Sequence, residues 1–78
     1  MEKITIDIII SMELSALSKF STIIAPHLSD NEMIIKNSMI DASNSIYTVN
    51  MEISELILDL LLYKLTEIND VIREIIYL

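Results

Sequence analysis

The chain has 78 residues, a length that allows one small domain, and it contains neither cysteine nor glycine. These absences exclude disulfide bonds, thiolate metal sites and a glycine-rich phosphate-binding loop. The formal net charge of −7 arises from twelve Asp and Glu residues against five Lys and Arg residues, and it opposes binding to nucleic acid and to anionic lipid.

The first segment with helical spacing covers about residues 8–24. Its main apolar residues share one stripe of a helix: Ile10, Leu14, Leu17 and Ile24. Residues 4–8 are ambiguous, because isoleucine alternates there with polar residues, as it does in a strand. We therefore expect residues 1–7 to be either the start of this helix or an extended lead-in.

Pro26 marks the clearest break, since proline disfavours the helical conformation at the residue before it. Ser29 and Glu32 then match the two ends of a capping box, the signature of a helix start. We expect a loop over about residues 25–29 and a second helix over about 30–47. The absence of glycine argues against β-hairpins, whose tight turns favour residues with positive φ.

The stretch 41–50 contains mostly poor helix formers. The second helix therefore either bends at about 48–50, where Asn50 would cap a third helix, or continues into the C-terminal segment. That segment, a predicted helix over about 51–77, carries an apolar seam with the spacing of a coiled coil. The seam consists of Ile57, Leu61, Leu65, Ile68, Ile72 and Ile75.

The apolar surface of this last helix is wider than the single face of an ordinary surface helix. One flank of the seam is where we expect a second chain to pack, and Tyr63 interrupts an otherwise acidic outer face. The predicted interface residues are Leu56, Ile57, Leu58, Leu60, Leu61, Leu62, Tyr63, Leu65, Ile68, Ile72 and Ile75.

These elements predict an all-α fold, which is either a helical hairpin or a small three-helix domain. Chains of this length bury only about 60% of their unfolded surface and are marginally stable alone. We therefore expect the domain to complete its core by oligomerisation or by docking on a partner. No uncharged apolar stretch reaches the 18 or so residues of a transmembrane helix, so none is expected.

Candidate chemical sites are few. Glu52, Glu55 and Asp59 would share one helical stripe, but they lack the spacing of known oxygen-ligand or di-iron motifs, so we interpret them as a solvated face. His27 has no evident orienting group or nucleophile and is interpreted as an exposed loop residue. We predict no enzyme, with no catalytic residue, metal, cofactor or small-molecule substrate.

Residues 29–54, SDNEMIIKNSMIDASNSIYTVNMEIS, resemble part of the small needle and inner-rod proteins of type III secretion systems. Pro26 and Ser29-Asp30 take the place of that family's loop, and Met39-Ile40 and Tyr47-Thr48-Val49 fall in its following helix. The resemblance covers about a third of the chain. It implies a helix–loop–helix hairpin in a helically polymerising subunit that is secreted without a cleavable signal.

The residues themselves predict a small acidic helical protein–protein interaction module, such as an adaptor, an assembly or chaperone-type subunit, or an inhibitor. It would act through its Ile/Leu-rich helical face on a second copy or on another protein, in the cytoplasm. Two alternatives stay open: a structural subunit of a helical assembly such as a secretion needle or rod, and an acidic DNA-mimic inhibitor.

Overall fold

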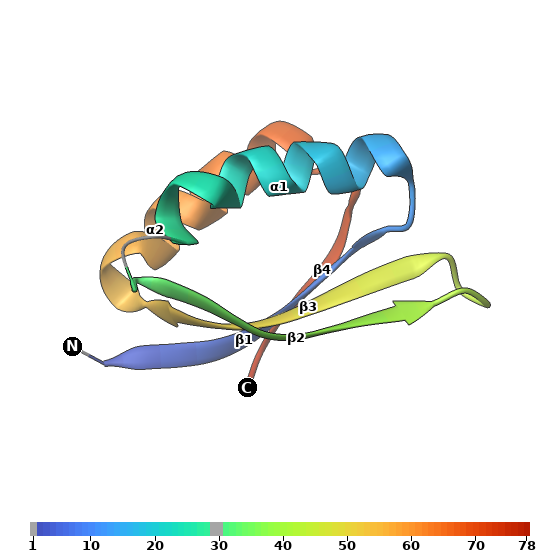
Figure 1. Ribbon diagram of the computed structural model, residues 1–78. Helices are drawn as coiled ribbons and strands as arrows, with labels where there is room; N and C mark the ends of the chain where they lie inside the picture. Colours follow the sequence, from blue (N-terminus) through green and yellow to red (C-terminus); the bar gives the residue numbers. More distant parts are fainter. Residues whose placement is uncertain (1, 29–30) are drawn as a thin grey trace.

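The computed structural model describes residues 2–28 and 31–78 (Figure 1). Its four strands are β1 (Lys3–Ser11), β2 (Met33–Asp41), β3 (Ile46–Ser54) and β4 (Ile72–Tyr77). Helix α1 (Leu14–Leu28) connects β1 to β2. Helix α2 (Glu55–Leu65), followed by the short 3₁₀ helix η1 (Thr66–Ile68), connects β3 to β4.

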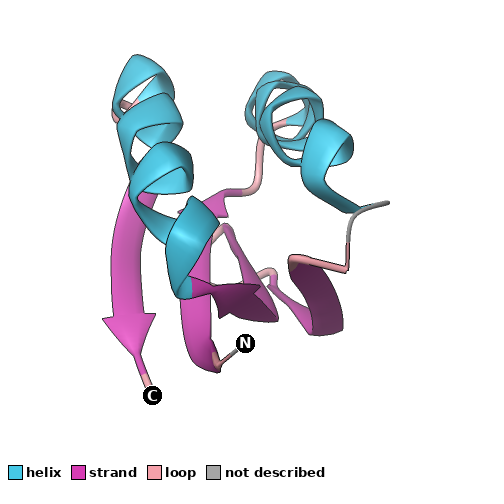
Figure 2. Ribbon diagram, turned by 90° about the vertical axis from the view of Figure 1, so that its left-hand side faces the viewer, coloured by secondary structure: helices cyan, strands magenta, loops and turns pink. Residues whose placement is uncertain are grey.

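The strands form one sheet in the order β2-β3-β1-β4, and every neighbouring pair is antiparallel. Both helices lie on the same face of this sheet, so the molecule has one helix layer and one sheet layer (Figure 2). The other face of the sheet has no covering layer in the described residues. The element order and strand order are those of the split βαβ, or ferredoxin-like, topology.

Strand β1 is formed by the alternating isoleucines near the start of the chain. Ile6, Ile8 and Ile10 are fully buried beneath the helices, whereas Asp7 and Ile9 point to the uncovered face and are only partly buried. The first residues were expected to be either the start of a helix or extended. In the structure they are extended, and the strand continues to Ser11. β-Branched side chains suit such a half-buried pleated surface.

The core lies between the two central strands and the helices. On β3 the same alternation places Val49, Met51 and Ile53 toward the helix layer, directly opposite isoleucines of β1. The helices contribute buried side chains at helical spacing. These are Ala16, Phe20 and Ile24 of α1 and Leu61 and Leu65 of α2, with Ile68 of η1 beside them.

The predicted all-α fold is wrong, and so are the helical hairpin, the three-helix domain and the coiled coil. The helix expected over 30–47 and the bend expected at 48–50 are replaced by β2 and β3, and the hairpin implied by the resemblance is a β-hairpin. Residues 46–54 are rich in β-branched and aromatic residues, and their inward side chains recur every second position. Short apolar runs fit both helical and strand templates, and strand pairing decided between them.

The helix predicted over 51–77, which was expected to carry the coiled-coil seam, is divided among several elements. Residues 51–54 belong to β3, and Ser54 rather than Asn50 caps α2; the Ser54 hydroxyl accepts the Leu56 N–H at 3.1 Å. The last two seam residues, Ile72 and Ile75, belong to β4. The seam is therefore one apolar surface of a mixed core and not the face of one helix.

Proline and the missing glycine have weaker effects than expected. Pro26 lies in the last turn of α1, which continues to Leu28, because only the final backbone bonds of the helix are affected there. The β2–β3 hairpin turns without glycine, since Ser45 adopts a φ of 54° at a cost of about 1–2 kcal/mol. The proposed capping box falls partly on residues 29 and 30, which lie outside the described residues.

The dimensions of the domain are those of a compact chain of its length. Its accessible surface of 4827 Å² equals the roughly 4,800 Å² typical of a folded monomer of 8.9 kDa. Its radius of gyration, 11.8 Å, is close to the roughly 11.5 Å of a compact chain of this length. The sheet supplies, within one chain, cover that was expected from helices or from a partner. Completion of the core by oligomerisation or docking stays a prediction.

Candidate interaction surface

The structure separates the eleven predicted interface residues into three groups. Leu61, Leu65 and Ile68 are buried in the core of the same chain. Ile57, Leu58, Ile72 and Ile75 are partly buried and pack against that core. Leu62 is also partly buried. Leu56, Leu60 and Tyr63 are exposed on α2 at helical spacing, and we call these three the α2 stripe.

The other candidate residues do not form a chemical site. Glu52 lies on β3 and pairs with Lys36 at 3.8 Å, whereas Glu55 and Asp59 lie on α2. His27 is in the last turn of α1 and not in a loop. Among the described residues, no group of three His, Cys, Asp or Glu side chains is placed to hold a metal ion.

The most exposed apolar strand of the molecule is β2, which forms one edge of the sheet. All residues from 34 to 40 are exposed, and the largest exposures are 63% for Met39 and 64% for Ile40. The register with β3 places Met39 on the uncovered face and Ile40 on the helix-facing side. We call this strand with its exposed apolar side chains the β2 edge: Ile34, Ile35, Met39 and Ile40.

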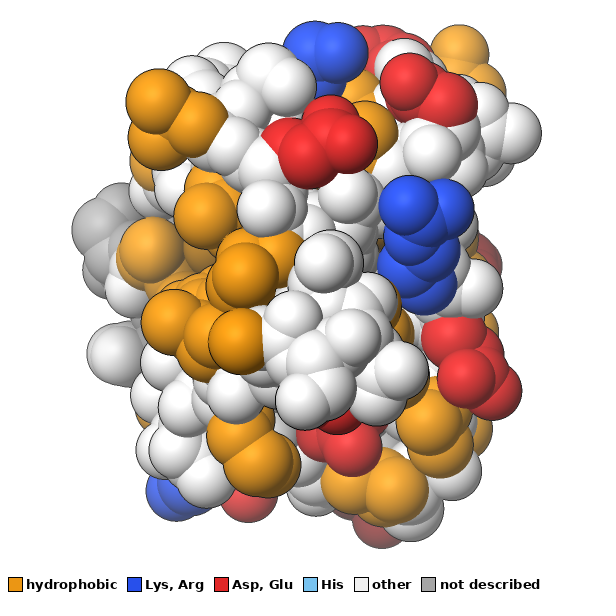
Figure 3. Space-filling view, turned by 90° about the vertical axis from the view of Figure 1, so that its right-hand side faces the viewer, with side chains coloured by type: hydrophobic (Ala, Val, Ile, Leu, Met, Phe, Trp, Pro, Cys, Tyr) orange, Lys and Arg blue, Asp and Glu red, His pale blue; other side chains and the backbone are white. Residues whose placement is uncertain are grey.

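A groove of about 310 Å³ lies between α1 and the neighbouring strands β2 and β3. We call it the α1–β2 groove, and it is lined by Leu17, Phe20, Ser21, Ile24, Ile35, Tyr47 and Val49. Hydrophobic side chains gather in the same region in Figure 3, between the helix layer and the β2–β3 hairpin. Because Ile35 lines the groove and Ile40 is on the same side of the sheet, the groove is continuous with the helix-facing part of the β2 edge.

Sequence reasoning missed this surface because residues 33–41 were assigned to a helix. A signal for the hairpin is segment 42–45, Ala-Ser-Asn-Ser, which separates a run containing Ile and Met from a run rich in Ile, Tyr, Thr and Val. That arrangement indicates a hairpin but does not indicate which of its two strands lies at the edge of the sheet. Only the sheet order shows that β2 is an outer strand and β3 an inner one.

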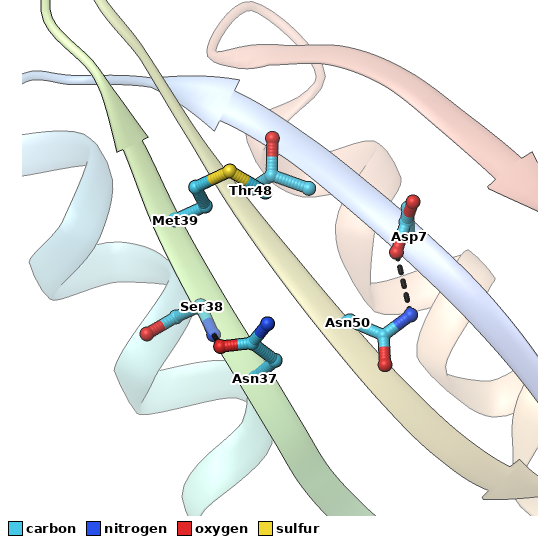
Figure 4. Close-up of a pocket in the computed structure, with 6 residues that line it drawn as sticks. All are labelled: Asp7, Asn37, Ser38, Met39, Thr48 and Asn50. Carbon is cyan, nitrogen blue, oxygen red and sulfur yellow. Dashed lines mark hydrogen bonds between the residues drawn. The ribbon is translucent and has the colours of Figure 1, made fainter.

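A shallow polar pocket of about 170 Å³ lies on the uncovered face of the sheet (Figure 4). Asn50 donates to the Asp7 carboxylate at 2.7 Å, and this bond links β3 to β1. Asn37 accepts the backbone N–H of its neighbour Ser38 at 2.8 Å. The backbone N–H of Ser38 is thus held by a side chain of its own strand.

The β2–β3 turn is stabilised by Asp41, which ends β2. Its carboxylate accepts the side-chain amide of Asn44 at 2.8 Å and the Asn44 backbone N–H at 3.2 Å. These hydrogen bonds favour the ionised carboxylate and hold the pKa of Asp41 below its ordinary value of 3.8, the side-chain bond contributing most. Asp41 is therefore a fixed negative charge at the end of the β2 edge.

We predict that Asn44→Ala raises the pKa of Asp41 toward its ordinary value, because the larger of the two Asn44 contributions is lost. The stabilisation from this pair is present above the unfolded-state pKa and is lost as the pH falls through the lowered folded-state pKa. A carboxyl-carbon NMR titration of both proteins measures the change. Asn69→Ala, at an exposed position outside β2 and β3, serves as the control and leaves the Asp41 titration unchanged; an unaltered titration in Asn44→Ala would contradict the assignment.

Comparison with protein-family models, with curated proteins and with solved structures finds no match to this chain. Within residues 2–28 and 31–78, no helix combines the length and the apolar character needed to cross a membrane. The fold class is therefore assigned from the topology alone. The surface described above is the basis for a proposal about function.

Proposed function

We propose that this protein is a small protein–protein interaction module that binds an extended segment of its partner along the β2 edge, with partner side chains in the α1–β2 groove. The observation that carries the proposal is the exposed apolar outer strand beside an apolar groove. The mode differs from the helical face expected from the sequence. In this mode backbone hydrogen bonds supply affinity and pockets for side chains supply specificity.

An outer strand presents a row of backbone N–H and C=O groups without strand partners, and these groups pair readily with another chain. Folded proteins usually guard such edges with charges, prolines, short strands or bulges. β2 has nine residues and no proline, and Lys36 is the single charge within residues 34–40. A register shift near Lys36 guards the middle of the strand but leaves its second half, from Asn37 to Asp41, regular.

The opposite outer strand, β4, is better protected. It has six residues, and Arg73 and Glu74 are both exposed on it. The difference between the two edges supports binding at β2 rather than at β4.

An interface would take only a small part of the surface of this chain. A standard protein interface takes about 800 Å² from each partner, which is about a sixth of the 4827 Å² surface of this chain. The exposed apolar side chains of β2 and the groove beside them would form the apolar centre of such an interface. Apolar anchors in a pocket carry most of the binding energy in such interfaces.

Site-specific photo-crosslinking tests this proposal. A photoreactive phenylalanine analogue is introduced at Ile40 and, in a second protein, at Leu56 of the α2 stripe, which is similarly exposed at 70%. Both proteins are produced in their native cells, irradiated, and analysed for covalent adducts by mass spectrometry. We expect adducts from position 40 and few or none from position 56.

The two positions separate the two exposed apolar surfaces. Adducts from position 56 alone would mean that the partner binds at the α2 stripe, and would overturn the proposal. An absence of adducts from position 40, in protein shown to be folded by circular dichroism, would also overturn it.

A further inference from the structure

We infer that the partner at the β2 edge is a second copy of this chain, whose β2 pairs antiparallel with the first about a two-fold axis at Met39. The inference rests on the proposed function and names its partner. Such pairing joins the two four-stranded sheets into one sheet of eight, with both helix layers on the same side.

The direction of the backbone groups on β2 sets the register. In an antiparallel ladder, successive residues direct their N–H and C=O groups alternately toward one neighbour and toward the other side. The Ser38 N–H is bonded to the Asn37 side chain at 2.8 Å, which assigns the outward direction to Ser38 and, two residues on, to Ile40. Met39, paired with Thr48, directs its groups inward to β3.

A two-fold axis at Met39 matches this alternation. It places Ser38 of each copy opposite Ile40 of the other, and each such pair can exchange two backbone hydrogen bonds. On pairing, the Ser38 N–H exchanges its hydrogen bond to the Asn37 side chain for one to the strand of the second copy. Met39 then faces Met39 of the second copy at a position without backbone bonds, where side chains are closest.

The same register brings Ile40 of the second copy to the rim of the α1–β2 groove. Ile40 is on the helix-facing side of the sheet, as is Ile35, which lines the groove. The pairing therefore covers the two most exposed apolar side chains of β2, Met39 and Ile40, on opposite faces of the joined sheet.

Charge complementarity favours a second copy in this orientation. The ionised side chains of β2 are Lys36 and Asp41, one on either side of Met39. Antiparallel pairing places Asp41 of one copy opposite Asn37 and beside Lys36 of the other, whereas parallel pairing would bring like charges together. The existing ion pair of Lys36 with Glu52 is exposed and weak, so Lys36 exchanges it at little cost.

The net charge of −7 does not prevent this association, because most acidic residues lie away from β2. Glu55, Asp59, Glu67 and Glu74 belong to α2, η1 and β4, and β4 is the strand at the far edge of the sheet. Within β2 itself one base balances one acid. Repulsion between the copies is therefore long-range and screened by salt.

Sedimentation equilibrium of the purified full chain, from micromolar to near-millimolar concentration, tests the inference. We expect the wild-type mass to rise from 8.9 kDa toward twice that value. Met39→Lys and Met39→Glu each place two like charges face to face at the axis, and each should weaken dimerisation at least about tenfold. Leu56→Lys, an equally drastic change on the α2 stripe, should leave the association unchanged.

An equimolar mixture of Met39→Lys and Met39→Glu provides the decisive readout. Only a two-fold axis at residue 39 places this residue opposite itself, so the mixture should recover the dimer while each variant alone stays monomeric. A mixture that stays monomeric, or a Met39→Lys protein that associates as the wild type does, overturns the register. Circular dichroism confirms that each exposed-site variant is folded.

The outcomes distinguish this inference from the function on which it rests. A wild-type chain that is monomeric at every concentration, yet cross-links from position 40 to a different protein, overturns the second copy as partner and leaves the proposed function standing. A monomeric chain with no cross-link from position 40 overturns both.

Discussion

Replacing Leu61 with alanine should lower the free energy of unfolding by about 2–5 kcal/mol, the usual cost of truncating a buried leucine. Leu61 is 0% exposed and belongs to the core between α2 and the sheet. A domain of this size has only about 4–12 kcal/mol of total stability, so the variant loses a large part of it. Urea denaturation followed by circular dichroism measures the change.

Leu56→Ala is the matched control on the same helix, since Leu56 is largely exposed. Its cost should stay within about 0.5 kcal/mol, as for most surface substitutions. The loss in Leu61→Ala should also be independent of protein concentration, because the contacts lie within one chain. A loss that appears only at concentrations where the protein dissociates would instead make Leu61 an interface residue.

The second large effect is expected on β1, where adjacent isoleucines face opposite sides of the sheet. Ile8→Ala should cost about 2–5 kcal/mol, because Ile8 is fully buried opposite Val49. Ile9→Ala should cost clearly less, since Ile9 points to the uncovered face and is only partly buried. The same denaturation measurement compares the two variants.

This comparison tests the strand register directly. A shift of one residue in the pairing of β1 with β3 would exchange the two faces and reverse the order of the two costs. Similar costs for Ile8→Ala and Ile9→Ala would be expected of a helix or of a sheet covered on both faces, and would contradict the fold described here.

The sequence predicted the local features that depend on neighbouring residues. A helix was expected over 8–24, and α1 occupies Leu14–Leu28, with Phe20 and Ile24 buried at helical spacing. The first part of that expectation was wrong, because residues 8–11 belong to β1 and Leu14 is exposed. The alternation of isoleucine with polar residues at the start of β1 was recognised in the sequence, but both a helix start and an extended segment were kept as alternatives. Leu61, Leu65 and Ile68 were expected on one apolar face, and they do share one, but that face packs inside the chain.

The site was beyond sequence reasoning for a different reason. Ile34, Ile35, Met39 and Ile40 are apolar residues in a segment that fits a helix as well as a strand. These residues are exposed because β2 is an outer strand of the sheet. β2 is an outer strand because β3, and not β2, pairs with β1. No local pattern encodes that choice.

By itself, the sequence determined that the chain is one small acidic domain without thiol or glycine chemistry, and that its isoleucines and leucines must be covered. The tertiary structure decided what covers them. Strand β1 pairs with β3 across the intervening segment 12–45, which contains α1 and β2, with Ser11 opposite Ile46 and Lys3 opposite Ser54. Such pairing gains its free energy from contacts distant in sequence, so helix and strand alternatives of similar local preference are separated only when the whole sheet forms.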